Sequence, residues 1–240
     1  MLSCYYMDIS FDCSYEQMEI LHKIIPKERM EKIDKFRNRD KAKKHLLSNA
    51  FLQYGLSEVL NIPMEEITYA YGEYGKPGII HNGKDMREQV DFNLSHSGNY
   101  AVLAVSDRPV GIDVECLKKP RMAVAERFFC KKEYEDILKA EDLERENRFL
   151  EYWTMKEAYV KRTGNGLNTP LNSFLINRGR GGFSVVNQED IYFGTFFIEE
   201  KRYCVSVCSE YKDEIEKFSK DKMHEVKLQQ ILVSFINKYV

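Results

Sequence analysis

Apolar residues recur every three or four positions along two long stretches of the chain, and this spacing predicts two long amphipathic helices. The first covers about residues 40–60. The second covers about residues 142–162, and Gly164 follows it as a helix-ending residue. The apolar face of the first helix consists of Leu46, Leu47, Ala50, Phe51 and Tyr54. Shorter helices are predicted at residues 14–25, 26–36, 122–129, 132–139 and 225–239.

Short runs rich in β-branched and aromatic residues lie between these helices and predict strands. They cover residues 5–11, 67–71, 90–94, 100–106, 110–115, 174–176, 183–186, 191–198 and 202–207. Each half of the chain therefore begins with a strand, continues with helices that include one long member, and ends in antiparallel strands. This order favours an α+β fold of two similar lobes, residues 1–107 and 108–240, over a single mixed domain. Each lobe would have a small antiparallel sheet packed by a long helix.

Composition and charge exclude several classes of protein. The chain has 240 residues, of which 43% are hydrophobic, and its net charge of −2 gives no general basic field for nucleic acid. The apolar runs are too short to span a bilayer, and the first residues lack the basic flank of a signal peptide. The six cysteines form no C-x-x-C pair, so we expect reduced thiols and a cytoplasmic protein.

The residues after about 210 carry no recognisable motif. A charged stretch, residues 212–225, precedes the last predicted helix. The apolar positions Val226, Ile231, Leu232 and Phe235 follow helical spacing. We therefore expect this tail to pack on the second lobe rather than to hold a partner.

Two carboxylates lie close together in the segment Gly111-Ile112-Asp113-Val114-Glu115. On a strand, Asp113 and Glu115 point to one face, while Ile112 and Val114 point to the other, toward a core. Two like charges side by side need a positive partner, and a hard divalent cation with oxygen ligands, such as Mg²⁺, supplies one. Taken alone, the same pair also fits an ordinary solvent-facing strand edge.

A second acidic position lies in the long second helix, at residues 153–161. Glu157 and Lys161 are four residues apart and share a helical face with Trp153. In a functional interpretation, Glu157 is a third metal-binding carboxylate and Lys161 neutralises charge on a phosphoryl group. In the simpler interpretation, the two form an exposed ion pair worth ~0.3–0.5 kcal/mol.

The segment Ser95-His96-Ser97 follows a predicted strand and precedes Gly98. Its hydroxyl and imidazole groups, together with backbone N–H groups, fit a phosphate-binding turn, and they also fit a plain polar hairpin. Adjacent Ser and His residues do not supply the geometry of a hydrolase triad. The separate basic residues Arg29, Lys32 and Lys76 each fit a solvated surface charge when taken singly.

The order of these segments is more specific than any one of them. The chain resembles the surfactin-type 4′-phosphopantetheinyl transferases over roughly residues 5–210. The segments that carry the resemblance are Pro26-Lys27-Glu28-Arg29, Tyr74-Gly75-Lys76-Pro77, Asn93-Leu94-Ser95-His96-Ser97, Gly111-Ile112-Asp113-Val114-Glu115 and residues 153–161. The last two segments discriminate most strongly.

This resemblance implies a fold and a set of ligands. The expected fold is a single-chain pseudo-dimer of two α/β lobes, with coenzyme A and Mg²⁺ in the cleft between them. By similarity, Asp113, Glu115 and Glu157 are the Mg²⁺ ligands. The residues expected to contact coenzyme A are Arg29, Lys32, His45, Lys76, Ser95, His96 and Lys161.

The implied reaction moves the 4′-phosphopantetheine group of coenzyme A to a serine of an apo acyl or peptidyl carrier protein, and adenosine 3′,5′-bisphosphate leaves. Glu157 is the first candidate for the base that takes the serine proton, and Glu133 is the second. Lys161 is expected to protonate the departing phosphate. A metal-dependent phosphohydrolase that uses the same carboxylates is the alternative.

The carrier protein is expected to dock on the stretch after Glu115. The residues assigned to this surface are Lys118, Lys119, Arg121, Phe128 and Phe129. A related class, the small holo-acyl-carrier-protein synthases, has about half this length and is trimeric. The doubled length therefore implies a monomer. From the net charge and the short apolar runs, we expect no nucleic-acid or membrane partner.

Overall fold

The computed structural model describes residues 1–117, 122–179, 182–199 and 202–237. Its helices are α1 (Tyr15–Ile24), α2 (Lys27–Ile33), α3 (Arg39–Leu60), α4 (Met122–Phe128), α5 (Lys131–Lys139), α6 (Asp142–Thr163), α7 (Lys212–Glu216) and α8 (Leu228–Ile236). Its strands are β1 (Leu2–Asp8), β2 (Thr68–Tyr71), β3 (Pro77–His81), β4 (Lys84–Asp85), β5 (Asp91–Ser97), β6 (Tyr100–Ser106), β7 (Gly111–Cys116), β8 (Ile176–Gly179), β9 (Gly182–Val185), β10 (Tyr192–Ile198), β11 (Tyr203–Ser209) and β12 (His224–Glu225).

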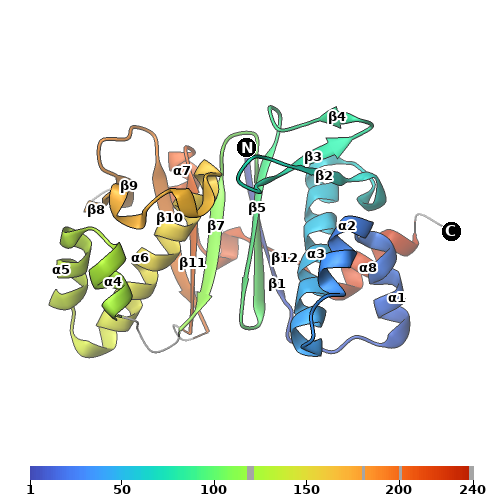
Figure 1. The fold of residues 1–240 in the computed structure, drawn as a ribbon, viewed down its shortest axis with the longest axis horizontal. Coiled ribbons are helices and arrows are strands. Elements are labelled where there is room, and N and C mark those ends of the chain that lie inside the picture. The colour runs from blue at the N-terminus through green and yellow to red at the C-terminus, as the bar shows by residue number, and fades with distance from the viewer. Residues whose placement is uncertain (118–121, 180–181, 200–201, 238–240) are drawn as a thin grey trace.

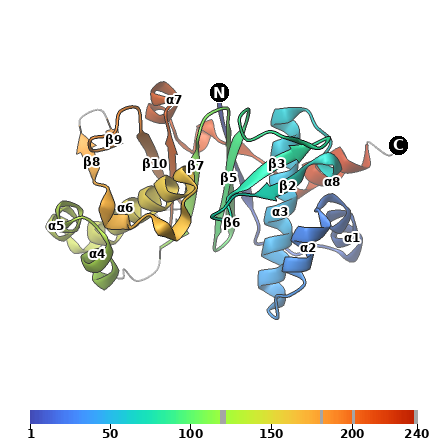
Figure 2. The ribbon, with the colours of Figure 1, turned by 45° about the horizontal axis from the view of Figure 1, so that its top comes forward.

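Two sheets form the centre of the molecule, and helices cover their outer faces (Figure 1). The first sheet has the strand order β12-β1-β6-β5 and the second has the order β7-β11-β10-β9-β8. Helices α1, α2, α3 and α8 lie beyond the first sheet, and α4, α5 and α6 lie beyond the second (Figures 1 and 2). A third, small sheet, β2-β3-β4, belongs to the first half. The predicted α+β fold of two similar lobes, each built on one long helix, is confirmed.

The strand β6 shows how the two halves share one interior. All seven of its residues are buried, because both of its faces are covered. Leu103 and Val105 belong to the core that includes helix α3. The alternate residues Val102 and Ala104 belong to a second core, which includes Ile112 and residues of β11. Because side chains alternate along β6, one face of this strand packs on the layer of α3 and the other face packs on the second sheet.

Local signals set the ends of several helices. Ser14 caps α1, because its Oγ accepts the backbone N–H of Gln17. In return, the side-chain oxygen of Gln17 accepts the backbone N–H of Ser14. Helix α3 ends at Asn61 (φ 53°) and helix α6 at Gly164 (φ 74°), both in the left-handed conformation that closes a helix. These positions agree with the helix ends that the sequence predicts.

The C-terminal residues pack on the first half, so the expectation that they pack on the second half is wrong. Val226, Ile231, Leu232 and Phe235 lie in the same core as helices α1 and α3. Strand β12 pairs in parallel with β1 and adds an edge to the first sheet. The apolar spacing of the tail predicts that it packs, but the same spacing does not say on which core.

Strand β3 is a second difference from the sequence prediction, which places no strand between residues 71 and 90. Ile79 of β3 is fully buried and pairs with Tyr69 of β2. The flanking turns at Gly75 (φ 83°) and Gly83 (φ 74°) are present, and their closeness hides the short strand between them. In the described part of the chain, no helix is long and apolar enough to cross a membrane. All six cysteines are free thiols.

Candidate active site

The carboxylates of Asp113 and Glu115 lie on β7, on the face away from Ile112 and Val114, which are buried in the core between the sheets. Each carboxylate accepts a hydrogen bond from a serine of β5. Ser95 Oγ donates to Asp113 Oδ1 at 2.7 Å, and Ser97 Oγ donates to Glu115 Oε2 at 2.8 Å. Strands from the two halves of the chain therefore meet at these two acids.

Lys161 lies on helix α6 and reaches the same point. Its Nζ is 2.6 Å from Asp113 Oδ1, 2.9 Å from Ser95 Oγ and 3.3 Å from the carbonyl oxygen of Ile112. The ammonium group of this α6 residue is thus held by groups of two strands, β5 and β7. The structure brings together Ser95, Asp113 and Lys161, which come from three separate segments of the sequence.

A glycine explains why α6 lies so close to β7. A Cβ atom at Gly111 would lie 1.9 Å from the carbonyl oxygen of Ala158 and 2.7 Å from the backbone nitrogen of Arg162. Only a residue without a side chain allows this contact between the backbones of the strand and the helix. Gly111 therefore sets the distance at which Lys161 meets Asp113.

Glu157 lies one turn before Lys161 on α6 and is partly buried. Burial, and then the negative charge of Asp113 and Glu115, raise the pKa of Glu157, whereas Lys161 lowers it. Burial and the two neighbouring acids therefore act in the same direction on Glu157, and Lys161 opposes them. A positive ion among the three carboxylates would relieve the repulsion between them.

One oxygen of this group has no partner. Asp113 is 3% exposed, and its Oδ2 atom is buried without a hydrogen bond among the described residues. Three carboxylates with one unsatisfied oxygen fit a hard divalent cation by their chemistry. As the side chains stand, no group of three or more His, Cys, Asp or Glu in the described ranges is close enough to hold a metal ion. Lys161 is the cation that balances Asp113 in this arrangement.

His45 and His96 lie together, although they come from α3 and β5. Their ring centroids are 4.7 Å apart in an edge-to-face arrangement, and Phe36 stacks on His45 at 4.3 Å. Burial of the His96 ring, followed by the nearby His45, Lys161 and Lys44, lowers the pKa of His96 to about 4. Burial, and then Lys41, also lower the pKa of His45. An anion bound beside these two rings would favour their protonated forms.

Arg29 and Lys32 both lie on α2 and both cover tyrosines of β2. The Arg29 guanidinium lies 4.0 Å from the ring centroid of Tyr69, and Lys32 Nζ lies 4.3 Å from that of Tyr71. Arg29 also donates to Asn49 Oδ1 at 2.7 Å, while its Nε is buried with no partner among the described residues. Arg29 therefore keeps a donor that its protein neighbours do not use.

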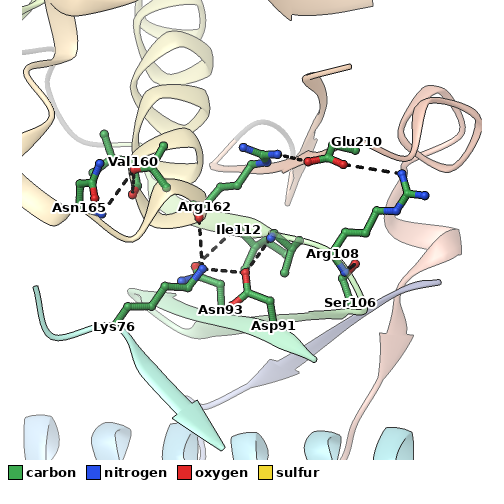
Figure 3. Close-up of polar contacts among 12 residues, drawn as sticks. Lys76, Asp91, Asn93, Ser106, Arg108, Ile112, Val160, Arg162, Asn165 and Glu210 are labelled. Carbon is green, nitrogen blue, oxygen red and sulfur yellow. Dashed lines mark hydrogen bonds and ion pairs between the residues drawn. The ribbon is translucent and has the colours of Figure 1, made fainter. Parts of the chain in front are cut away.

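Lys76 connects the two halves of the chain (Figure 3). Its Nζ is 2.7 Å from Asp91 Oδ2 and 3.2 Å from the carbonyl oxygen of Arg162, near the end of α6. Arg162 in turn pairs with Glu210, which lies 3.6 Å from Arg108. In this structure the Lys76 ammonium is thus used in a tie between the lobes.

Glu133 lies in the interior of the second half. The contacts described below join it to groups other than the carboxylates of Asp113, Glu115 and Glu157. Its Oε2 atom is 2.9 Å from Nζ of Lys156, and both side chains are 1% exposed or less. Glu133 also accepts the backbone N–H groups of Cys130 and Ile176. Both oxygens are therefore satisfied by protein groups, and these contacts favour a structural role over that of a base.

The expected carrier-docking surface is only partly described. Lys118, Lys119 and Arg121 lie outside the described residues. Phe128 is 44% exposed, as a surface contact requires. Phe129 is only 4% exposed and packs in the core of the second half against Trp153, so its assignment to the surface is wrong. Adjacent residues on a helix end point in different directions, and here only the first faces solvent.

Ser97 is a site residue to which the sequence analysis gives no role of its own. It lies two residues after Ser95, and both side chains point toward β7. The alternation of side chains along a strand was the available signal. To use this signal, one must know that β5 lies beside β7, the strand of the two acids. The sequence alone does not show that the two strands are neighbours.

Comparisons with known proteins match both halves of the chain. A family model described as the 4′-phosphopantetheinyl transferase superfamily matches residues 109–208, and a model described as 4′-phosphopantetheinyl transferase, N-terminal, matches residues 10–108. The chain is 32% identical to the 4′-phosphopantetheinyl transferase Sfp of Bacillus subtilis, over 83% of this chain and 88% of that protein. It is 35% identical to the 4′-phosphopantetheinyl transferase psf-1 of Bacillus pumilus, over 73% of each chain.

A solved structure, a holo-(acyl-carrier-protein) synthase from Bacillus anthracis in complex with coenzyme A, covers 42% of this chain and 92% of its own. Its identity is 16% and its TM-score 0.36, values too low to bear on the assignment. The family models and the two Bacillus relatives span both halves of the chain. The chain therefore belongs to the 4′-phosphopantetheinyl transferase superfamily and is an enzyme of its Sfp-like branch.

Proposed function

We propose that this chain transfers the 4′-phosphopantetheine group of coenzyme A to a serine of an apo carrier protein, with Mg²⁺ bound by Asp113, Glu115 and Glu157. The observation that carries the proposal is the group of acids and Lys161 at the junction of the two halves. It combines a buried oxygen of Asp113, for which the described residues offer no hydrogen bond, with an ammonium group and two serine hydroxyl groups. Mg²⁺ bound there would offset the charge of the phosphate oxygens.

The basic and imidazole groups of the first half are assigned to coenzyme A. Arg29, Lys32 and Lys76 are proposed to hold its 3′-phosphate end and adenine region. His45 and His96, which already lie against each other, are proposed to contact phosphate, with Ser95 beside them. Binding in this way fixes the phosphorus atom near Lys161, and positioning of this kind supplies much of the rate in phosphoryl-type transfer.

Glu157 is the proposed base for the serine hydroxyl of the carrier. It is proposed to take the proton while bound to the metal, whose charge would offset the burial and the acidic neighbours that raise the pKa of Glu157. Lys161 is proposed to stabilise negative charge on the departing phosphate and to protonate it. Its ammonium group is already beside Asp113 and therefore next to the proposed metal ligands.

Partners and setting follow from the same proposal. The acceptor is an acyl or peptidyl carrier protein, and the exposed Phe128 is part of the surface proposed to receive it. The enzyme is proposed to act as a cytoplasmic monomer, since each half supplies part of one complete site.

The direct test is to mix the protein with coenzyme A, Mg²⁺ and an apo carrier protein and to weigh the carrier by mass spectrometry. We expect a gain of one phosphopantetheine, and no gain with Asp113→Ala or without Mg²⁺. Omitting the carrier tests the alternative, a metal-dependent phosphohydrolase, which would release phosphate from coenzyme A. Phosphate release without a carrier, and no mass gain with several different carriers, would overturn the proposal.

A further inference from the structure

The two central sheets meet along β5 and β7, and side chains of β5 bond there to backbone groups on the β7 side. Residues at alternate positions of β5 accept backbone N–H groups of β7 or of the residue before it. Asp91 Oδ2 accepts Val110 N–H at 2.8 Å, and Asn93 Oδ1 accepts Ile112 N–H at 3.2 Å. Figure 3 shows the Asp91 and Asn93 end of this seam. Backbone donors of an edge strand are thereby satisfied across the junction.

Ser97 continues the seam at the end of β5 and has two partners on β7. Its Oγ accepts the N–H of Cys116 at 3.1 Å and donates to Glu115 Oε2 at 2.8 Å. Because the N–H of Cys116 approaches one side of the oxygen, the hydroxyl hydrogen is left for the carboxylate. The side chain of Ser97 is therefore held in one direction by the strand that carries Glu115.

The turn after Ser97 is itself fixed by the second half. Tyr203 of β11 accepts the N–H of Asn99 through its hydroxyl oxygen at 3.2 Å. Gly98 has φ 58°, and a Cβ atom there would lie 2.6 Å from the same hydroxyl oxygen. With the turn locked against β11, Ser97 has little freedom to move away from Glu115.

We propose that Ser97 is a positioning residue that orients the carboxylate of Glu115 for the metal ion. The proposal rests on the proposed function, in which Glu115 is a metal ligand. Hydrogen bonds from neighbouring groups fix the orientation of a ligating carboxylate, and their loss typically weakens metal binding ~10–100-fold. Ser97 meets this requirement because it is buried and contacts the carboxylate and the backbone of the next residue together.

The test measures metal binding without turnover. Mn²⁺ is titrated into the protein with coenzyme A and without carrier, and free Mn²⁺ is followed by electron paramagnetic resonance. We expect Ser97→Ala to weaken Mn²⁺ binding ~10-fold or more. Ser97→Thr keeps the hydroxyl group and is expected to recover most of the affinity.

Asn93→Ala is the matched control, since it removes a bond of the same seam that involves neither acid. It is expected to lower the thermal unfolding midpoint as Ser97→Ala does, while Mn²⁺ affinity stays at the wild-type value. Equal Mn²⁺ affinity of Ser97→Ala and wild type, or an equal loss in Asn93→Ala, would overturn the positioning role alone. No Mn²⁺ binding by the wild type, or undiminished binding by Asp113→Ala, would overturn the metal site and this role with it.

Discussion

Lys156 and Glu133 form a charge pair in the interior of the second half, and Lys156 immediately precedes Glu157. Lys156 is fully buried, and its Nζ donates to Glu133 and to the carbonyl oxygens of Leu171 and Phe174. Burial lowers the pKa of Lys156, whereas Glu133 raises it. Burying such a pair costs the free energy of removing both charges from water. Removing only one partner is more destabilising, because it leaves a buried charge without a counter-charge.

This geometry separates the two candidates for the base. Glu133→Gln is expected to lower the free energy of unfolding by about 3–5 kcal/mol, because Lys156 loses its counter-charge. Turnover measured well below the unfolding temperature should stay close to that of the wild type, since the contacts of Glu133 seen in the described ranges are with Lys156, Cys130 and Ile176 and not with the proposed metal ligands. Denaturant unfolding and the carrier mass assay measure the two quantities.

The double variant Glu133→Gln/Lys156→Met is the control for this prediction. With both charges removed, its loss of stability should be smaller than the sum of the two single losses. A folded Glu133→Gln protein with normal Mn²⁺ affinity and strongly reduced turnover would contradict the prediction and return Glu133 to the mechanism.

At the scale of elements, the contact between β7 and α6 decides the site. The two acids of β7 and the two charged groups of α6 are each set by local geometry. Their meeting requires that the helix backbone lie directly on the strand at Gly111. A side chain at this position would push α6 away from β7 and so separate Glu157 and Lys161 from the two acids of β7.

Gly111→Ala tests this contact. Its Cβ would lie 1.9 Å from the carbonyl oxygen of Ala158, and an overpacked contact of this kind typically costs about 1–3 kcal/mol. We expect lower stability together with a loss of turnover and of Mn²⁺ affinity, because Lys161 and Glu157 are displaced from Asp113. Thermal unfolding, the mass assay and the Mn²⁺ titration measure these effects.

Gly179→Ala provides the comparison. A Cβ at this position would lie 3.6 Å or more from its neighbours, an ordinary contact, so stability and turnover should stay close to those of the wild type. If Gly111→Ala loses stability and yet keeps full Mn²⁺ affinity, the strand-to-helix contact does not set the geometry of the acids.

At the scale of the whole molecule, the chain crosses between its halves more than once. The first core is completed by helix α8 from the C-terminal end, and β12 extends the first sheet. Lys76 of the first half contacts the end of α6, and the seam of β5 joins β7. The two halves are consequently expected to unfold together. The first half needs α8 and β12, which follow the second half in sequence, and side chains of the first half bond to β7 and α6 of the second.

The tail provides a matched test of this arrangement. Ile231 is fully buried in the first core, and Val233 of the same helix is 39% exposed. Ile231→Ala is expected to lower the free energy of unfolding by about 2–5 kcal/mol. Val233→Ala is expected to change it by no more than about 0.5 kcal/mol. Equal losses for the two variants in denaturant unfolding would contradict the packing of α8 on the first half.

Residue patterns close in sequence predicted the elements and part of the site well. The spacing of apolar residues gave both long helices to within a residue or two, and Ser14 and Gly164 marked helix ends. The alternation in residues 111–115 correctly separated the two acids from Ile112 and Val114, which are buried. Strand β3 was missed because its two flanking turns leave too few residues for a periodic signal.

What the sequence by itself determined is therefore local: which residues share a face, and which order of segments places the chain in its family. The tertiary structure decided which faces meet. It set Ser97 against Glu115, enclosed Glu133 with Lys156 and returned the tail to the first core. The physical reason is that backbone dihedral angles fix the period within an element, whereas partners across elements depend on how the whole apolar surface is buried.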